Sequence, residues 1–334
     1  MNRILAAAAL ALLALLAGTL PVRAEVSEVK LVLQNGSNYL PMLIMREHKL
    51  VEKHLKTKGL EATKVTWARL AGPAAIVDSF LAGAVDFAAQ GIPSTAVLWD
   101  RTRNGIRVKA VSALVASNIW LMTRKPELKS LRDISDKERI AVPSVKTSSQ
   151  ALFIWAAAEK EFGPGQWGKL DHVTVSVPHP EAMAAVMSPR GEITIHAATS
   201  PYADIERKVG LHAVTDLYTV HGGPVSGLNL VTTETFRGAN PATYDAVVSA
   251  FQEALAWLNA DKRRAAKFYL EATKDKMPLA DLEEILLAPD YIFDQVPRGI
   301  DSAMAMMHKS GILKSPPTSW KDMYMPETHK LPGN

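Results

Sequence analysis

The chain has 334 residues, of which 48% are hydrophobic and 22% are charged, so it can bury a core and is neither disordered nor fibrous. Its formal net charge is only +4 and its longest basic run is residues 262–264, which does not favour nucleic-acid binding by bulk electrostatics. The sequence contains no cysteine, which excludes disulfides, Cys-ligated zinc, iron–sulfur clusters, a thiol nucleophile and a lipid-modified N-terminal cysteine.

The first 24 residues are typical of a secretory signal peptide. Arg3 precedes the apolar stretch 4–20, and the small residue Ala24 suits cleavage before acidic Glu25. The alternative is a membrane anchor, but a stretch of 17 apolar residues is at the short limit for crossing a bilayer. We therefore predict a mature protein, 25–334, that is soluble and exported.

The mature chain alternates strand-like runs with helical stretches that follow short loops of Gly, Pro, Ser, Thr and Asn. Strands are expected at 29–34, 64–70, 86–90, 106–114, 118–124, 139–142, 172–177, 192–197 and 228–232. Helices are expected at 41–50, 73–83, from 93, 147–162, 181–191, 201–209, 241–259, 261–274, 279–287 and 299–309. Thr147 with Gln150 fits a capping box, and the proline-rich tail from Ser315 is expected on the surface. This alternation predicts parallel sheets with right-handed crossovers, the α/β class.

Two runs of this pattern, 29–112 and 118–212, predict two α/β lobes. The late strand 228–232 and the helices after it need a sheet to pack on, and the first lobe is the natural place. The expected boundaries are 25–115 with 225–334 for lobe 1, 116–224 for lobe 2, and two crossings near 113–120 and 220–228.

Ligands of open α/β sheets bind where strands end and the next helices begin. The loops at these positions are built of small polar residues, whose backbone N–H groups can meet an anion or a polar acceptor. The predicted ligand-binding residues are Asn35, Ser37, Asn38, Tyr39, Gly72, Gly91, Pro93, Ser94, Lys146, Thr147, Ser148, Ser149, Thr199, Ser200 and Tyr202. Each loop alone could equally be an ordinary cap or turn, but five loops of one kind favour a shared cleft.

Four side chains of these loops carry further hypotheses. Lys146 is either a solvated loop lysine or a positive charge that meets an anionic ligand beside three hydroxyl residues. Tyr39 and Tyr202 either cap apolar patches or close over a ligand. His179 stands out among the nine histidines because it lies in a loop of the proposed cleft.

The enzyme motifs that can be tested fail. Gly163, Gly168 and Lys169 match the spacing of a phosphate-binding loop, but Leu170 stands where Ser or Thr must bind magnesium. Ser27 and Lys30 fit SxxK only within a predicted strand, where chance is the better account. The sequence has no GxSxG, HExxH or EF-hand loop. We therefore predict no catalytic residue, no metal and no cofactor.

Several segments together resemble one family, the periplasmic substrate-binding proteins of nitrate/sulfonate/taurine-type (NitT/TauT) ABC importers. The resemblance is carried by Pro41 before a helix, LAGAVD at 81–86, SLRDI at 130–134, IAV at 140–142 and TSP at 199–201. It covers nearly all of 25–313. Two departures from the family pattern, basic Lys146 and the absence of a tryptophan near 196–199, leave the ligand's identity open.

The resemblance implies a bilobal type II binding-protein fold, two α/β lobes joined by two crossings, which closes on a small solute. It implies ligand contacts from loops 36–39, 72, 91–94, 146–149 and 199–202. The implied function is capture of a small organic anion or oxyanion and its delivery to an inner-membrane ABC permease and its ATPase. We expect a monomer that is not an enzyme.

Two alternatives remain for the function. The protein could present its solute to a membrane sensor instead of a permease, which would use the same cleft. It could also be an enzyme related to the thiamine-pyrimidine synthases that share the fold. Those enzymes carry a cysteine-rich iron site, which a chain without cysteine cannot form.

Overall fold

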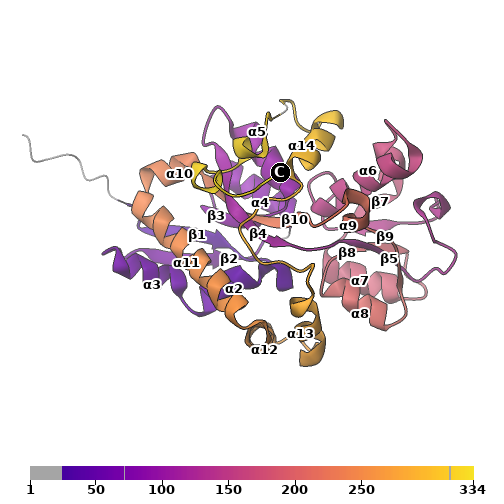
Figure 1. Ribbon diagram of the computed structural model, residues 1–334, viewed down its shortest axis with the longest axis horizontal. Coiled ribbons are helices and arrows are strands. Elements are labelled where there is room, and N and C mark those ends of the chain that lie inside the picture. Colours follow the sequence, from indigo (N-terminus) through magenta and orange to yellow (C-terminus); the bar gives the residue numbers. More distant parts are fainter. Residues whose placement is uncertain (1–24, 71, 316) are drawn as a thin grey trace, which may run out of the picture.

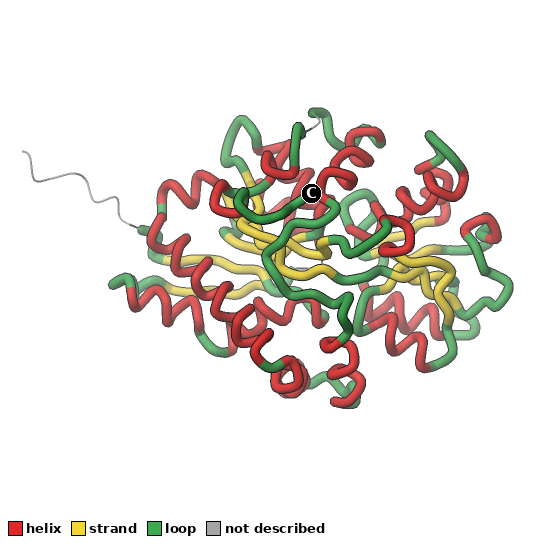
Figure 2. Tube along the Cα trace, viewed as in Figure 1, coloured by secondary structure: helices red, strands yellow, loops and turns green. Residues whose placement is uncertain are grey.

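The computed structural model describes residues 25–334 except 71 and 316. The predicted signal peptide, residues 1–24, lies outside the described residues. The chain forms two halves that lie side by side along the long axis, each with strands inside and helices outside (Figures 1 and 2). None of the described helices combines the length and the hydropathy needed to cross a membrane.

The described residues form two five-stranded sheets with one plan of strand order. The first sheet has the order β2-β1-β3-β10-β4, built from β1 (Glu28–Val32), β2 (Lys64–Ala68), β3 (Phe87–Gln90), β4 (Val108–Ala116) and β10 (Ser226–Thr233). The second has the order β7-β6-β8-β5-β9, built from β5 (Trp120–Thr123), β6 (Ile140–Val142), β7 (Thr174–Ser176), β8 (Ile195–Ala198) and β9 (His212–Asp216). The α/β class is confirmed.

The sheets are mixed rather than parallel, which corrects one expectation. β1, β2 and β3 run parallel, as do β6, β7 and β8, but β10 is antiparallel to β3 and β4, and β5 is antiparallel to β8 and β9. Both antiparallel strands directly follow a passage of the chain from one sheet to the other. The chain leaves the first sheet after Ala116 and returns to it before Ser226. No crossover helix separates β4 from β5, so these passages do not impose the parallel direction of a βαβ unit.

Helices cover both faces of each sheet. On the first sheet, one face carries α2 (Leu40–Glu47), α3 (Leu50–Thr57), α10 (Glu234–Ala239), α11 (Pro241–Ala260), α12 (Lys262–Thr273) and α13 (Leu279–Leu287), and the other carries α4 (Pro73–Leu81), α5 (Ile92–Thr102) and α14 (Ile300–Lys309). On the second sheet, one face carries α6 (Ser149–Phe162) and α9 (Leu217–His221), and the other α7 (His179–Met187) and α8 (Tyr202–Lys208). Short 3₁₀ turns are η1 (Ser37–Tyr39), η2 (Leu131–Asp133), η3 (Trp167–Val173), η4 (Trp320–Met323) and η5 (Pro326–Thr328).

The strand sequences explain the layers. Leu31 and Val32 are adjacent in β1 and are both buried, yet they belong to the cores on opposite faces of the sheet. Successive side chains of a strand point to opposite faces, so only a sheet covered on both sides buries both. The core that holds Val32 also holds Ile140 and Ile195 of the second sheet. This one core, to which α4, α5 and α6 also contribute, therefore extends across both halves.

Three local expectations are wrong. The predicted helix 41–50 ends earlier, as α2 at Glu47, and a second helix that was not predicted, α3, begins at Leu50 after the left-handed backbone of Lys49 (φ 51°). Helix α6 is capped by Ser148, whose hydroxyl accepts from the Ala151 N–H, and not by Thr147. The tail is not a surface segment: Tyr324 is fully buried and its hydroxyl donates to Asn229 Oδ1 of β10 at 2.6 Å.

Candidate ligand-binding site

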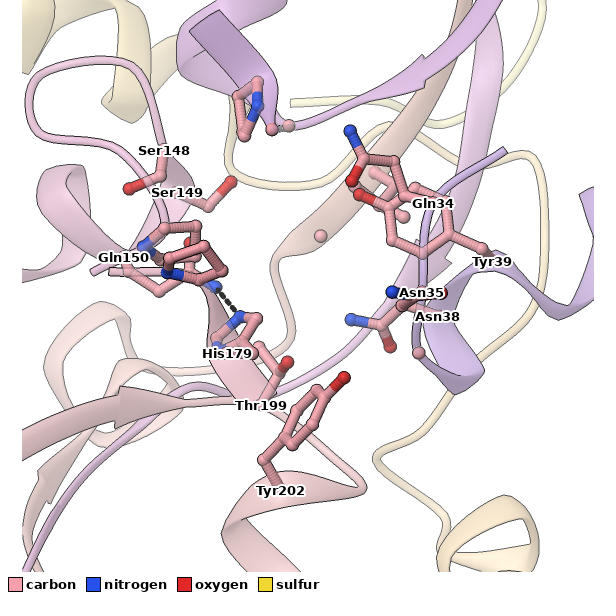
Figure 3. A pocket seen from close by; sticks show the side chains of 18 of the residues that line it. Gln34, Asn35, Asn38, Tyr39, Ser148, Ser149, Gln150, His179, Thr199 and Tyr202 are labelled. Atoms are coloured by element: carbon pink, nitrogen blue, oxygen red, sulfur yellow. Dashed lines mark hydrogen bonds between the residues drawn. The ribbon is translucent and has the colours of Figure 1, made fainter. Parts of the chain in front are cut away.

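A cavity with a volume of about 370 Å³ lies where the two halves meet (Figure 3). The first half contributes Gln34, Asn35, Gly36, Asn38, Tyr39, Arg69, Leu70, Gly72, Pro73, Gly91, Gly227 and Leu228, and Ser117 lies beside them in the passage that directly follows β4. The second half contributes Ile119, Pro143, Thr147, Ser148, Ser149, Gln150, Pro178, His179, Pro180, Glu181, Thr199, Ser200 and Tyr202. This size is within the usual range for small-molecule sites, and the lining combines small, apolar and uncharged polar side chains with two charged ones, Arg69 and Glu181.

Most of the predicted site residues lie in this lining. They are Asn35, Asn38, Tyr39, Gly72, Gly91, Thr147, Ser148, Ser149, Thr199, Ser200 and Tyr202. They follow strands of both sheets, and the topology brings the carboxyl ends of those strands to a common edge.

Ser37, Pro93 and Ser94 lie behind the lining. The Ser37 hydroxyl is 2.8 Å from the hydroxyl of Tyr291, which donates to Asn38 Oδ1 at 2.6 Å. The hydroxyl of Ser94 donates to Gln90 Oε1 at 2.7 Å, and Pro93 is buried in the first turn of α5. These side chains support the wall from inside the first half and do not face a solute.

Lys146 does not line the cavity, which corrects the expectation of a lysine anchor. Its side chain is exposed and lies at a small separate hollow beside Trp155 and Asp171. Its backbone is left-handed (φ 65°), so the loop turns sharply at this residue, and Thr147, Ser148 and Ser149 reach the cavity while Lys146 faces the other side of α6.

Three polar side-chain atoms of the lining are buried and have no hydrogen-bond partner among the described residues. They are Gln34 Nε2, Ser117 Oγ and Ser149 Oγ. Buried polar groups are nearly always hydrogen-bonded, so a bound molecule is the natural partner for these atoms.

Two glycines make room for the unpartnered hydroxyls. A Cβ at Gly91 would lie 2.6 Å from Ser149 Oγ, and one at Gly227 would lie 2.8 Å from Ser117 Oγ. Gly91 belongs to the first half and Ser149 to the second, so the absence of a side chain at 91 allows the halves to approach at this point.

The electrostatics of the cavity favour an anion. The residues that cap α4, α5, α6 and α7, namely Gly72, Gly91, Ser148 and Pro178, all line it, so four positive helix ends converge there. Among the described lining residues, Arg69 is the only lysine or arginine and Glu181 is the only carboxylate, so the positive field comes chiefly from the helix ends.

The sequence reasoning missed Gln34, Arg69, Ser117, Gln150 and Glu181 as lining residues. Gln34 and Arg69 stand at or next to the ends of the predicted strands 29–34 and 64–70. The rule that ligands collect at the carboxyl ends of strands could therefore have been applied to the last strand residues as well as to the loops.

A buried histidine cluster supports the second half of the lining. The ring of Tyr202 stacks on that of His179, with centroids 5.0 Å apart and 15° between the planes. His179 Nε2 lies 3.1 Å from the Gln150 amide nitrogen, His179 Nδ1 lies 2.8 Å from His196 Nε2, and His196 Nδ1 lies 2.5 Å from Glu206 Oε1. His196 and Glu206 are completely buried.

Burial sets the charge of this cluster. It raises the pKa of Glu206 to about 8 and lowers the pKa of His196 to about 3. The pKa of His179 is lowered well below its ordinary value, first by burial and then by His196. Burial also raises the pKa of Tyr202 to about 12. At neutral pH the cluster is therefore uncharged as a whole. Among the described residues, no group of three or more His, Cys, Asp or Glu side chains could hold a metal ion.

The sequence pattern of the NMT1-like family matches residues 23–270. The chain belongs to the NMT1-like family. No curated protein matches the sequence. The resemblance to sulfonate- and nitrate-binding proteins that the sequence indicated is confirmed by solved structures with the same fold.

The alkanesulfonate-binding protein SsuA from Xanthomonas axonopodis pv. citri, bound to MOPS, has a TM-score of 0.69 and 14% identity, and the match covers 90% of this chain and 99% of that one. The aliphatic sulphonate binding protein SsuA from Escherichia coli has a TM-score of 0.64 and 15% identity, with coverages of 90% and 99%. The nitrate-binding protein NrtA from Synechocystis PCC 6803 has a TM-score of 0.65 and 14% identity, with coverages of 91% and 87%. All three of these structural neighbours are binding proteins. The periplasmic binding-protein fold is confirmed.

Proposed function

We propose that this protein is a periplasmic solute-binding protein, which captures a small organic anion or an oxyanion in the cavity between its halves and delivers it to an ABC permease. The observation that carries the proposal is the set of unpartnered polar atoms, Gln34 Nε2, Ser117 Oγ and Ser149 Oγ, that face one cavity from both halves. The helix N-termini around them and Arg69 support an anionic solute.

The proposed ligand-binding residues are those predicted ones that line the cavity, with five additions. The additions are Gln34, Arg69, Ser117, Gln150 and His179. A thermal-shift screen of the exported protein against sulfonates, carboxylates, nitrate, bicarbonate and heterocycles identifies the solute class. Stabilisation by heterocycles alone would contradict an anion site.

Arg69 and Lys146 form a matched pair for testing the charge. Arg69 is exposed at the cavity and Lys146 is exposed outside it. Replacing Arg69 by Ala should weaken an anion by about 1 to 1.5 kcal/mol, or roughly five- to tenfold, and Lys146→Ala should leave the affinity unchanged. Calorimetric titration of both variants measures the difference. Equal losses in the two variants would mean that Arg69 acts only through the general field of the protein.

The two lobes are proposed to close on the solute. Residues 25–115 together with 225–334 form one lobe, and residues 116–224 form the other. Gly222 and Gly223 in the second passage both have positive φ, at 92° and 156°, and glycine there can absorb a backbone rotation. Ion pairs between Lys208 and Asp281 and between Lys309 and Glu159 join helices of the two halves. Because closure brings the two lobes together, small-angle scattering should give a smaller radius of gyration with saturating solute than without solute. An unchanged radius would count against closure.

Export, delivery and oligomeric state are separate parts of the proposal. Intact-mass measurement of protein recovered from the periplasm should give a chain that begins at Glu25. Size-exclusion chromatography of the same protein should give the size of a monomer. Retention in the membrane fraction would exclude this processing. Neighbouring genes for a permease and an ATPase would favour import, and a neighbouring membrane sensor would favour presentation of the solute to a receptor.

A further inference from the structure

The chain of hydrogen bonds behind the cavity connects four elements. Gln150 lies in the first turn of α6, His179 at the start of α7, His196 in β8 and Glu206 in α8. Gln150 and His179 line the cavity, whereas His196 and Glu206 have no exposed surface. The chain therefore runs from a fully buried carboxyl group to the wall that a solute would touch.

Glu206 is fully buried and its only hydrogen-bond partner among the described residues is His196, so the two groups are stable only when they are neutral as a pair, which fixes the number of protons in the chain. The pair formed by His196 and Glu206 must hold two protons in total, one more than an ionised carboxylate beside a neutral imidazole. Glu206 Oε2 has no hydrogen-bond partner, so a proton there would be a buried donor without an acceptor. The extra proton therefore lies in the bond between Glu206 Oε1 and His196 Nδ1.

The direction of the other bonds follows from this placement. With its Nδ1 engaged by the Glu206 proton, the His196 ring carries a hydrogen on Nε2, which donates to His179 Nδ1. His179 is neutral and accepts at Nδ1, so its own proton is on Nε2 and points to Gln150. A half-turn of the Gln150 amide brings its carbonyl oxygen to this donor and leaves its NH₂ group free to donate.

We propose that Glu206 and His196 are positioning residues that hold His179 as the Nε2–H tautomer, so that this wall offers N–H donors to the acceptor atoms of a solute. The inference rests on the proposed function for the chemistry of the solute. It adds residues to the site that touch no solute and act only through His179 and Gln150.

Loss of the Glu206 proton reverses the donor and acceptor roles along this chain of hydrogen bonds. The ionised carboxylate accepts from His196 Nδ1–H, His196 Nε2 then accepts from His179 Nδ1–H, and His179 Nε2 becomes an acceptor. Glu206 also feels Arg207, which favours its ionised form, and Asp204, which opposes it. The other ionisable groups at the cluster are Tyr202 on the His179 ring, with Glu181 and Asp275 acting on that tyrosine.

The tautomers can be read directly by two-bond ¹⁵N–¹H correlation NMR of the histidine-labelled exported protein without solute. At pH 7, His179 and His196 should both carry hydrogen on Nε2 and not on Nδ1. Raising the pH to 9.5 should move the His179 proton to Nδ1, with a midpoint near pH 8, and Glu206→Gln should abolish this change. Glu192→Gln, an exposed glutamate outside the cavity, is the matched control and should behave like the parent.

A His179 proton on Nδ1 at pH 7 would overturn the inference, as would a tautomer change that persists in Glu206→Gln. The pH series of the parent protein decides the question even if the variant does not fold, because an unchanged His179 tautomer up to pH 9.5 also overturns it. Titration with nitrate and methanesulfonate on the same spectra separates the two proposals. If the tautomers are as expected and neither these anions nor those of the thermal-shift screen bind, the anion-binding function fails and the assignment of positioning residues stands.

Discussion

The two walls of the cavity reach a similar polar surface by different means. The wall from the first half is supported by neutral hydroxyl and amide bonds, as in the group of Ser37, Asn38 and Tyr291. The wall from the second half is supported by ionisable groups that burial keeps uncharged, His179, His196 and Glu206. The first wall can therefore be rigid at any pH near neutrality, whereas the second depends on where its protons lie.

The two walls therefore set different properties of the site. The first wall sets its shape, and the second sets which groups donate or accept hydrogen bonds. Gly91 on the first wall sets how closely the halves approach, since a side chain there would collide with Ser149, and Gly227 leaves room for Ser117 within the first wall. The second wall carries the groups whose donor or acceptor character can change. We expect substitutions behind the first wall to alter packing and those behind the second to alter both folding and recognition.

The largest expected effect is on stability. Replacing His196 by Ala removes a fully buried ring and leaves Glu206 and His179 without their hydrogen-bond partner, so it should lower the free energy of unfolding by about 3 to 5 kcal/mol. Tyr291→Phe, the corresponding change behind the first wall, should cost about 1 to 3 kcal/mol because it leaves neutral acceptors unpaired. Urea unfolding followed by circular dichroism measures both. His172→Ala, at an exposed histidine, is the control and should stay within about 0.5 kcal/mol of the parent. Equal costs behind the two walls would remove the distinction.

The next effect is on affinity and tests whether a solute bridges the walls. Ser117→Ala on the first wall and Ser149→Ala on the second should each weaken the solute found in the screen by about 1 to 3 kcal/mol, roughly 5- to 150-fold. Each hydroxyl is buried and lacks a partner among the described residues, so a solute that hydrogen-bonds to it in the parent protein loses that bond in the variant. Calorimetry gives the affinities, with Ser79→Ala in α4 as a control outside the cavity. If only one variant binds more weakly, the solute contacts one wall alone.

The third effect is the pH dependence of stability. Between pH 4.5 and 8, folded Glu206 holds a proton that the unfolded chain has released, so the free energy of unfolding falls as the pH rises. Below pH 6.5 the lowered pKa values of His179 and His196 act in the opposite sense, because there the unfolded chain binds protons that the folded state does not. Stability should therefore decline by about 1 to 2 kcal/mol between pH 6.5 and 8.

Denaturant titrations at these pH values measure the decline. Glu206→Gln should remove it, and Tyr291→Phe should retain it, because the first wall has no group that titrates in this range. A decline of unchanged size in Glu206→Gln would assign it to another group.

The smallest effect concerns the outer side of the second wall. Lys146 has a left-handed backbone, which disfavours residues with a Cβ, so Lys146→Gly should raise the free energy of unfolding by about 0.5 to 1 kcal/mol. The affinity for an anion should not change, since the side chain faces away from the cavity. Thermal melting and calorimetry measure the two quantities. A loss of affinity would return Lys146 to the site.

The sequence by itself determined the class of the fold, the family resemblance and the loops that build the cavity. These features depend on local signals: strands alternating with helices, Gly and Pro before helix starts, and the rule that ligands collect where strands end. Gly72, Gly91, Ser148 and Ser149 could therefore be assigned to the cavity from their positions in loops.

Only the tertiary structure decided which side chains face the cavity and which support it. Ser37 and Lys146 stand in the correct loops, but a buried tyrosine 254 positions away engages one and a left-handed turn directs the other outward. The partners of His179 are 17 and 29 positions away and lie on other elements. Such contacts depend on backbone angles and on the packing of distant segments, and neither leaves a periodic pattern or a spacing in the sequence.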